Sequence, residues 1–124
     1  MTEDFLWNDT AFPRLLFENA RDAILITGKD GNIIAANPMA SQLFGYAHDK
    51  LLGFSLDRII EPFYVPDKKG KKNAAPLLET TGVTEKKKKI PLEVSISDFS
   101  YHSEWYRIYI PRDVSNRKAV EEEM

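Results

Sequence analysis

Residues 22–38 read DAILITGKDGNIIAANP, and this stretch decides the fold. An apolar, β-rich run ends at Thr27, a turn with Asp30-Gly31 follows, and a second apolar run ends at Ala36. Two apolar runs joined by an Asp-Gly turn predict a β-hairpin.

A helix is expected to begin directly after this hairpin. Asn37 can accept hydrogen bonds from free backbone amides, and Pro38 suits a first helical position. Gly45 stands where a left-handed residue ends a helix. The apolar face between these signals consists of Met39, Leu43 and Phe44.

Upstream, the spacing of apolar residues from Thr10 to Ala20 predicts an amphipathic helix. Phe12, Leu15 and Leu16 form its apolar stripe. A stripe needs a partner surface, and two are equally compatible with the pattern: the sheet of the same chain, or a second copy of the chain.

Downstream, Ser55 is placed to cap a short helix that contains Ile59. Residues 61–75 carry Pro, Gly and several Lys residues and predict a solvated loop. Pro76 to Glu79 is expected to form a helical turn. Strands are predicted at 82–85, 90–97 and 105–110. A helix is predicted to begin at Ser115, and because no stop signal follows it, we expect the chain to be a fragment of a longer protein.

Alternation within the last two strands assigns their faces. The predicted inward residues are Leu92 and Val94 in one strand and Tyr106, Ile108 and Ile110 in the other. The predicted outward residues include Trp105 and Tyr109. Because no strand–helix–strand repeat occurs, the pattern indicates an α+β fold with an antiparallel sheet and helices on one side.

Composition excludes several classes of protein. The chain has 124 residues, enough for one domain, a net charge of -2 and no cysteine. Disulfides, thiolate metal sites and a cysteine nucleophile are thereby excluded. The lysines at 68–72 and 86–89 lack interleaved aromatic residues in a net acidic chain, so nucleic-acid binding is disfavoured. Residues 1–8 do not form a signal peptide, and we expect a cytoplasmic domain without membrane contact, whose parent protein could be membrane-anchored.

A family resemblance rests on short motifs in a fixed order. They are LFENA at 16–20, DAILI at 22–26, Asp30-Gly31, Ala36-Asn37-Pro38, LFGY at 43–46, Leu52-Gly53, IPLEVS at 90–95 and RDVSNRK at 112–118. This order resembles the PAS family, and it covers about residues 14 to 120. One departure is Gly28, where the family often has an acidic residue.

The resemblance implies a five-stranded antiparallel sheet that curls over short helices and encloses a ligand cavity. It divides the chain into an N-terminal flanking helix at 1–20, a PAS sensor domain at 21–114 and the start of a signalling helix at 115–124. Asp113 and Ser115 then couple the domain to a C-terminal effector, a diguanylate cyclase (GGDEF) domain or a histidine kinase, usually in a dimer.

Candidate ligand-cavity residues are apolar, and each is equally explained as plain core. They are Ile24, Ile26, Ile34, Met39, Leu43, Phe44, Ile59, Leu92, Val94, Tyr106, Ile108 and Ile110. Tyr106 is the most suggestive, because a buried phenol needs a hydrogen-bond partner and a ligand could supply it. Phe12, Leu15, Leu16, Trp105 and Tyr109 are the candidates for helix packing or a dimer contact.

Cofactor chemistry is narrowed by what the sequence lacks. The two histidines, His48 and His102, both fall in loop or turn contexts, which disfavours heme and zinc. A covalent flavin adduct needs a cysteine. Non-covalent flavin or a small metabolite stays open.

Three functions follow, in decreasing order of support. The first is a sensory domain of a bacterial signal-transduction protein that binds a small ligand or dimerises. The second is a ligand-free dimerisation module. The third, a small enzyme, is remote, because no nucleophile–base pair is evident and no catalytic residue can be named.

Overall fold

The computed structural model describes residues 11–61 and 77–116. Its elements, in chain order, are α1 (Ala11–Glu18), β1 (Leu25–Thr27), β2 (Ile33–Ala36), α2 (Pro38–Phe44), α3 (His48–Leu51), the 3-10 helix η2 (Leu56–Arg58), β3 (Leu77–Val83), β4 (Lys89–Tyr101) and β5 (Glu104–Asp113). The strands form one antiparallel sheet in the order β2-β1-β5-β4-β3. The predicted α+β class is confirmed.

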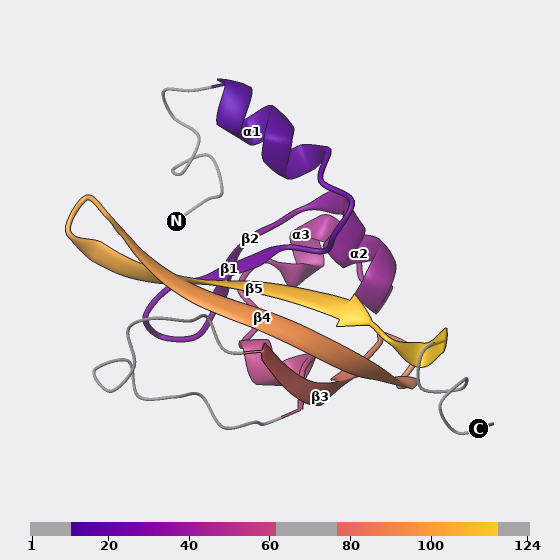
Figure 1. Cartoon of the computed structure of the whole chain (residues 1–124). Coiled ribbons are helices and arrows are strands. Elements are labelled where there is room, and N and C mark those ends of the chain that lie inside the picture. The colour runs from indigo at the N-terminus through magenta and orange to yellow at the C-terminus, as the bar shows by residue number, and fades with distance from the viewer. Residues whose placement is uncertain (1–10, 62–76, 117–124) are drawn as a thin grey trace.

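Strands β1 and β5 join the first hairpin to the C-terminal strands (Figure 1). Their register pairs Leu25 with Tyr109 and Ile26 with Ile108. Because directly paired residues point to the same side of a sheet, this register places Leu25 and Tyr109 on one face and Ile26 and Ile108 on the other.

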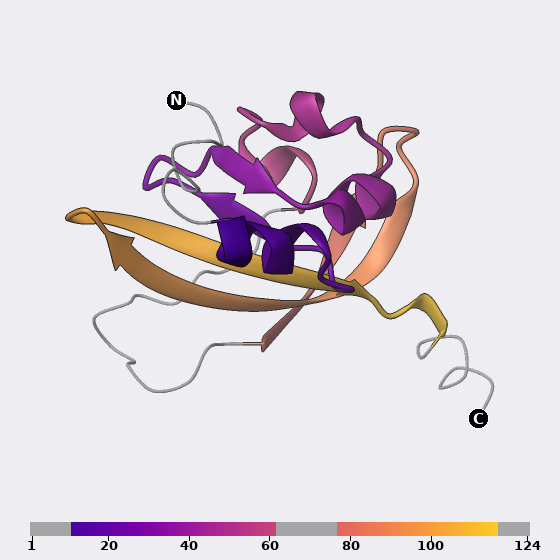
Figure 2. The ribbon, with the colours of Figure 1, turned by 90° about the horizontal axis from the view of Figure 1, so that it is seen from above.

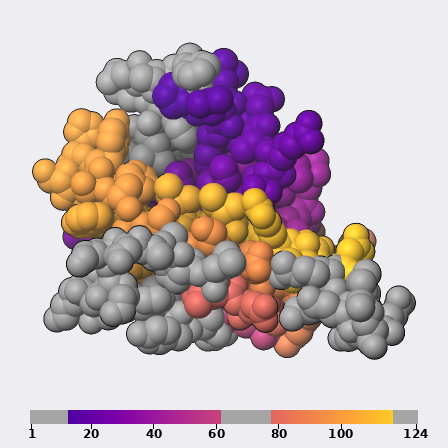
Figure 3. Space-filling model, viewed as in Figure 1, coloured from indigo at the N-terminus to yellow at the C-terminus, as the bar shows by residue number. Residues whose placement is uncertain are grey.

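The short helices α2, α3 and η2 gather on one side of the sheet, which we call the helix-facing side (Figure 2). Helix α1 stands off from this group at the β1–β2 end of the sheet (Figure 1). The space-filling view shows β4 and β5 as an orange and yellow band across the face turned to the viewer (Figure 3). The short helices therefore cover one face of the sheet, while β4 and β5 reach the surface on the other.

Helix α2 begins and ends at the residues that the sequence indicates. Asn37 is the N-cap, and Pro38 is the first helical residue. Gly45 adopts a left-handed conformation with φ of 82°, and its N–H donates to the Ser41 carbonyl at 2.8 Å. A residue with a side chain is disfavoured at that φ, which explains the glycine.

The side chain of Asn37 is fully buried and makes four hydrogen bonds. Its Oδ1 accepts from the N–H groups of Ile24 at 2.9 Å and Ala40 at 3.1 Å. Its Nδ2 donates to the carbonyls of Phe17 at 3.2 Å and Asp22 at 2.9 Å. The side-chain amide thereby uses its full hydrogen-bonding capacity. Asn37 links three segments: α1, the residues before β1, and α2.

The β1–β2 and β4–β5 hairpin turns use different chemistry. In the first, the Asp30 carboxylate accepts from the Asn32 N–H at 3.0 Å, and Gly31 has φ of 86°. In the second, His102 and Ser103 both have positive φ, 53° and 66°. Two consecutive positive φ values are typical of a type I′ hairpin turn, whose twist matches that of the strands.

Several local predictions were wrong. A helical turn was expected at Pro76 to Glu79, but Leu77 to Glu79 start β3, because Leu78 and Glu79 pair with Val94 and Glu93 of β4. Pro76 lies outside the described residues. The strand expected at 82–85 is the end of β3, which stops at Val83. Ser55 does not cap η2 through its side chain; its hydroxyl donates to the Asp57 carboxylate at 2.9 Å.

Most of the predicted loop at 61–75, and the tail at 117–124, lie outside the described residues. Of the lysine run, Lys89 begins β4, and the three lysines before it connect β3 with β4. Within residues 11–61 and 77–116, no helix combines the length and apolar character needed to cross a bilayer.

Candidate functional site

The helix-facing side of the sheet carries the main apolar cluster of the domain. Among the predicted cavity residues, Phe44, Ile59, Leu92 and Val94 are buried in it, and Met39 and Leu43 pack against it. Their neighbours include Leu25, Ile33, Leu51, Ile60, Ile96 and Tyr109, and most of these side chains are fully buried. These residues pack as core, and a ligand-binding role for them stays a prediction.

The predicted faces of β1, β2 and β5 were wrong. Ile26 and Tyr106 are buried in a second, smaller cluster, against which Ile24, Ile34 and Ile108 pack. Ile110 shares their side by alternation. We call this side the α1-facing side, because Phe17 of α1 is buried in the same cluster.

The reason for this error is that both sides of these strands are apolar. In β1, all three residues are buried, because helices cover one face and α1 covers the other. In β5, Tyr106 and Tyr109 are both 5% exposed although they lie on opposite sides. Apolar alternation identifies an inner face only when the other face is solvated.

The residues predicted for helix packing or a dimer contact separate into three groups. Leu15 and Leu16 of α1 are 57% and 60% exposed. The side chain of Phe12 lies outside the described residues. Tyr109 belongs to the helix-facing cluster, and Trp105, on the same side by alternation, is 52% exposed. The assignment of Trp105 and Tyr109 to the outer face was therefore wrong.

An ion pair lies at the polar end of the helix-facing side, and the sequence did not reveal it. Arg107 donates through Nε to Asp98 at 2.6 Å and through Nη2 at 3.3 Å, with both side chains about three-quarters buried. The hydrogen bond to Asp98, and a smaller one to Tyr109, raise the pKa of the guanidinium. Thr27, 1% exposed, lies opposite Arg107 on β1.

These side chains line a small cavity of about 150 Å³ that also contacts Trp105. The paired charges cancel, while the fork of Arg107 and the carboxylate of Asp98 offer both donors and acceptors. The site suits a polar, uncharged group. The signal in the sequence was two opposite charges at mirrored positions across the 102–103 turn, which becomes meaningful only once the register is known.

The end of β5 is joined to the residues that follow it by Asp113. Its carboxylate accepts hydrogen bonds from the N–H of Ser115 at 2.8 Å and from the Ser115 hydroxyl. Its neighbour Arg112 donates to Asp22 at 3.1 Å. The C-terminal exit therefore lies beside the segment that leads into β1.

Both histidines are exposed and lie apart from the polar cavity. His48 begins α3, and His102 occupies the β4–β5 turn. Within the part of the chain that the structure describes, no three histidine or carboxylate side chains gather closely enough to hold a metal ion.

A profile of the PAS domain family matches residues 14–79, more than half of the chain. The chain belongs to the PAS domain family. PAS domains are sensory modules and not enzymes. No curated protein matches the sequence.

Solved PAS domains share the fold of this one. The PAS domain of an HTR-like protein from Haloarcula marismortui is 26% identical, with a TM-score of 0.67 over 82% of this chain and 95% of its own. The PAS domain of nitrogen regulation protein NR(II) from Vibrio parahaemolyticus is 21% identical, with a TM-score of 0.70 over 84% of this chain and 99% of its own. A PAS domain from a two-component sensor histidine kinase is 17% identical, with a TM-score of 0.72 over 82% of this chain and 93% of its own.

Proposed function

We propose that this PAS domain is the sensory part of a bacterial, cytoplasmic signal-transduction module, and that it controls an effector attached to its C-terminal side. A small ligand, or a rearrangement between two copies of the domain, changes the position of the segment that follows Ser115. The observation that carries this proposal is the pair of hydrogen bonds from Ser115 to Asp113 at the end of β5.

Strand β5 is central to the argument because it touches both halves of the sheet. It pairs with β1 on one side and with β4 on the other. Its helix-facing residues Arg107 and Tyr109 line the polar cavity, and its last residue holds Ser115. A ligand in that cavity that favours one strand arrangement would shift the position of the exit.

The ligand that suits this cavity is small, uncharged and able to both donate and accept hydrogen bonds. The neutral Asp98–Arg107 pair supports this, because a carboxylate would have to displace Asp98. A small metabolite fits this description, and so does the polar edge of a non-covalently held flavin.

The effector is a histidine kinase or a diguanylate cyclase. Similarity to PAS domains of a two-component sensor histidine kinase and of NR(II) supports the kinase. The run Arg117 to Glu123 supports either, because it resembles linkers that lead into both kinds of effector.

The proposal is tested with Asp113→Ala in a fusion of the domain to a histidine kinase. We expect the variant to bind ligand with unchanged affinity while the kinase no longer responds to it. Native mass spectrometry and absorption spectroscopy of the purified chain identify the ligand first. Asp57→Ala is the matched control, because Asp57 also accepts from a serine hydroxyl, in η2. An equal kinase response in wild type and Asp113→Ala would overturn the coupling role.

A ligand-free dimerisation module is the second candidate. The adjacent exposed residues Leu15 and Leu16 favour it, because an apolar pair on a helix is a common dimer contact. Leu16→Glu should then turn a dimer into a monomer in analytical ultracentrifugation, with Gln42→Glu on α2 as the exposed control. A wild-type chain that is monomeric at all concentrations would exclude this function.

A further inference from the structure

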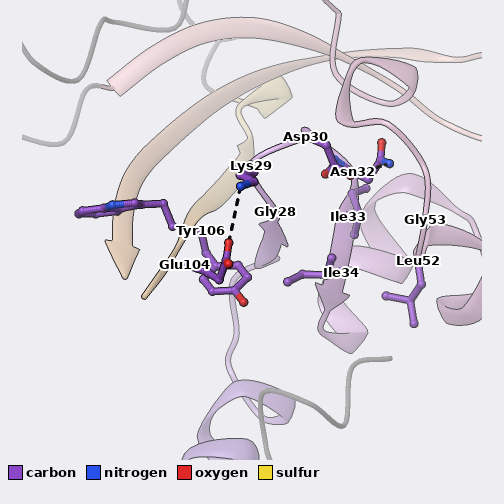
Figure 4. Close-up of a pocket in the computed structure, with 11 residues that line it drawn as sticks. Gly28, Lys29, Asp30, Asn32, Ile33, Ile34, Leu52, Gly53, Glu104 and Tyr106 are labelled. Atoms are coloured by element: carbon purple, nitrogen blue, oxygen red, sulfur yellow. Dashed lines mark hydrogen bonds and ion pairs between the residues drawn. The ribbon is translucent and has the colours of Figure 1, made fainter. Parts of the chain in front are cut away.

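A groove of about 670 Å³ lies beside the β1–β2 hairpin and adjoins the polar cavity between Asp98 and Arg107. The two share Gly28, Lys29, Trp105 and Tyr106. Its walls come from the β1–β2 turn, strand β2, the Leu52-Gly53 turn after α3 and the start of β5 (Figure 4). A volume of this size falls within the range of pockets that hold small organic ligands.

Tyr106 is the most unusual residue in this groove. Its side chain is 5% exposed, and its ring stacks on Phe99 with centroids 5.3 Å apart. Figure 4 shows its hydroxyl turned toward Ile34. No hydrogen bond joins that hydroxyl to a described residue, and it is not among the fully buried polar atoms, so it meets the groove. A phenol in a largely apolar setting suits a ligand that accepts its hydrogen bond.

The apolar part of the wall faces this hydroxyl. Ile34 and Leu52 are both partly buried; Ile34 extends toward Tyr106, and Leu52 lies farther along the groove, beyond β2 (Figure 4). An apolar wall with one convergent polar group is the usual composition of a small-molecule pocket.

The rim determines the charge that the groove accepts. Lys29 and Glu104 form an ion pair of 3.9 Å across the mouth, and Asp30 lies next to it without a second cation among the lining residues (Figure 4). Burial, and then the negative charge of Glu104, raise the pKa of the Tyr106 phenol. The hydroxyl is therefore protonated at neutral pH and can donate, while the rim disfavours anions.

We propose that this groove binds a neutral small molecule that has an apolar body and one carbonyl or hydroxyl acceptor. The body packs against Ile34 and Leu52, and the Tyr106 hydroxyl donates to the acceptor. The inference goes beyond the sensory function proposed above, since Ile34 and Leu52 line the groove and do not line the polar cavity.

The test is an NMR titration of the full ¹⁵N-labelled chain with three probes of similar size: benzamide, toluene and benzoate. With benzamide, we expect the largest amide shifts at Asn32, Ile34, Leu52 and Gly53, which line the groove and do not line the polar cavity. Benzamide should bind more tightly than toluene, which lacks an acceptor, and more tightly than benzoate, which is anionic.

The decisive variant is Tyr106→Phe, which removes one oxygen and leaves the ring in place. It should weaken benzamide binding roughly two- to ten-fold, the usual value of one hydrogen bond, and leave toluene binding unchanged. Tyr101→Phe is the matched control, because Tyr101 lies on the same side but outside the groove, and it should not change benzamide affinity. The amide spectrum of each variant reports whether the fold is kept.

Two outcomes would overturn the inference. One is equal benzamide affinity in wild type and Tyr106→Phe. The other is a set of shifts centred on helix-facing residues such as Thr27 and Arg107 and not on the groove. That second outcome would place the probe in the polar cavity, which leaves the proposed sensory function standing and removes only the second site.

Discussion

On the helix-facing side of the sheet, large aliphatic residues from strands and helices fill one continuous cluster, and most of them are fully buried. On the α1-facing side, the cluster is small, aromatic residues are prominent, and many of its members are only partly buried. The comparison teaches that the two sides of one sheet are packed to different degrees. The first side is the more completely buried, and the second leaves more of its side chains partly open.

The largest expected loss of stability comes from a change on the helix-facing side. Phe44 is fully buried in the helix-facing cluster, and Phe44→Ala should lower the free energy of unfolding by about 3–5 kcal/mol, since it leaves a cavity that cannot collapse. Phe99→Ala removes the same ring from the α1-facing side, where Phe99 is partly buried, and should cost less. Urea denaturation measures both. Equal losses would refute the contrast between the two sides.

A smaller loss of stability is expected when a methyl group is added to the cluster on the helix-facing side. At Gly82, a Cβ would meet Leu92 Cδ1 at 2.7 Å and Phe44 Cε1 at 3.1 Å. Gly82→Ala should therefore cost about 1–3 kcal/mol through overpacking. Gly28→Ala is the control, because the nearest atom to its Cβ is Asp30 Oδ1 at 3.4 Å, an ordinary contact. A neutral Gly82→Ala in thermal unfolding would mean that the cluster is less tightly packed than described.

The smallest expected change in stability concerns Tyr106 on the α1-facing side, and it depends on pH. The pKa of Tyr106 is raised above its ordinary value of 10.0, mainly by burial, so the folded state favours the protonated phenol. Its contribution is fully present below the unfolded pKa and is lost as pH rises through the folded pKa. Relative to Tyr106→Phe, the wild type should lose stability above pH ~10, and not below it. Urea midpoints of both proteins from pH 8 to 11 measure this, and parallel curves would contradict it.

Local signals in the sequence predicted most of the fold. The hairpin around Asp30-Gly31 and the start of α2 at Asn37-Pro38 depend on residues close in the chain, and both were correct. The start of β3 was missed, because Leu78 becomes a strand residue only through pairing with Val94, far along the chain. Local preference cannot reveal a partner of that kind.

The candidate site was harder to predict than the fold. The position of Tyr106 in an apolar environment was correct, but its side of the sheet was wrong, since α1 makes both sides apolar. Asp98 and Arg107 meet only because the 102–103 turn sets the register of β4 and β5. A shift of one residue would send one of them to the other face.

The order of the strands has a consequence for how the domain is assembled. Residues up to Glu61 hold β1, β2 and the short helices, and residues from Leu77 hold the β3–β4–β5 meander, so each half is built from near neighbours in sequence. The longest seam between the two halves is β1 against β5, and the Asp22–Arg112 ion pair, whose members are 90 positions apart in the chain, lies at its end. A shorter seam pairs Ile60 with Gly82 of β3. Long-range closures of this kind form late, because the loop entropy is lost before any contact compensates for it. The domain is therefore built from two locally organised pieces, and the closure between them places the residues before β1 beside the end of β5.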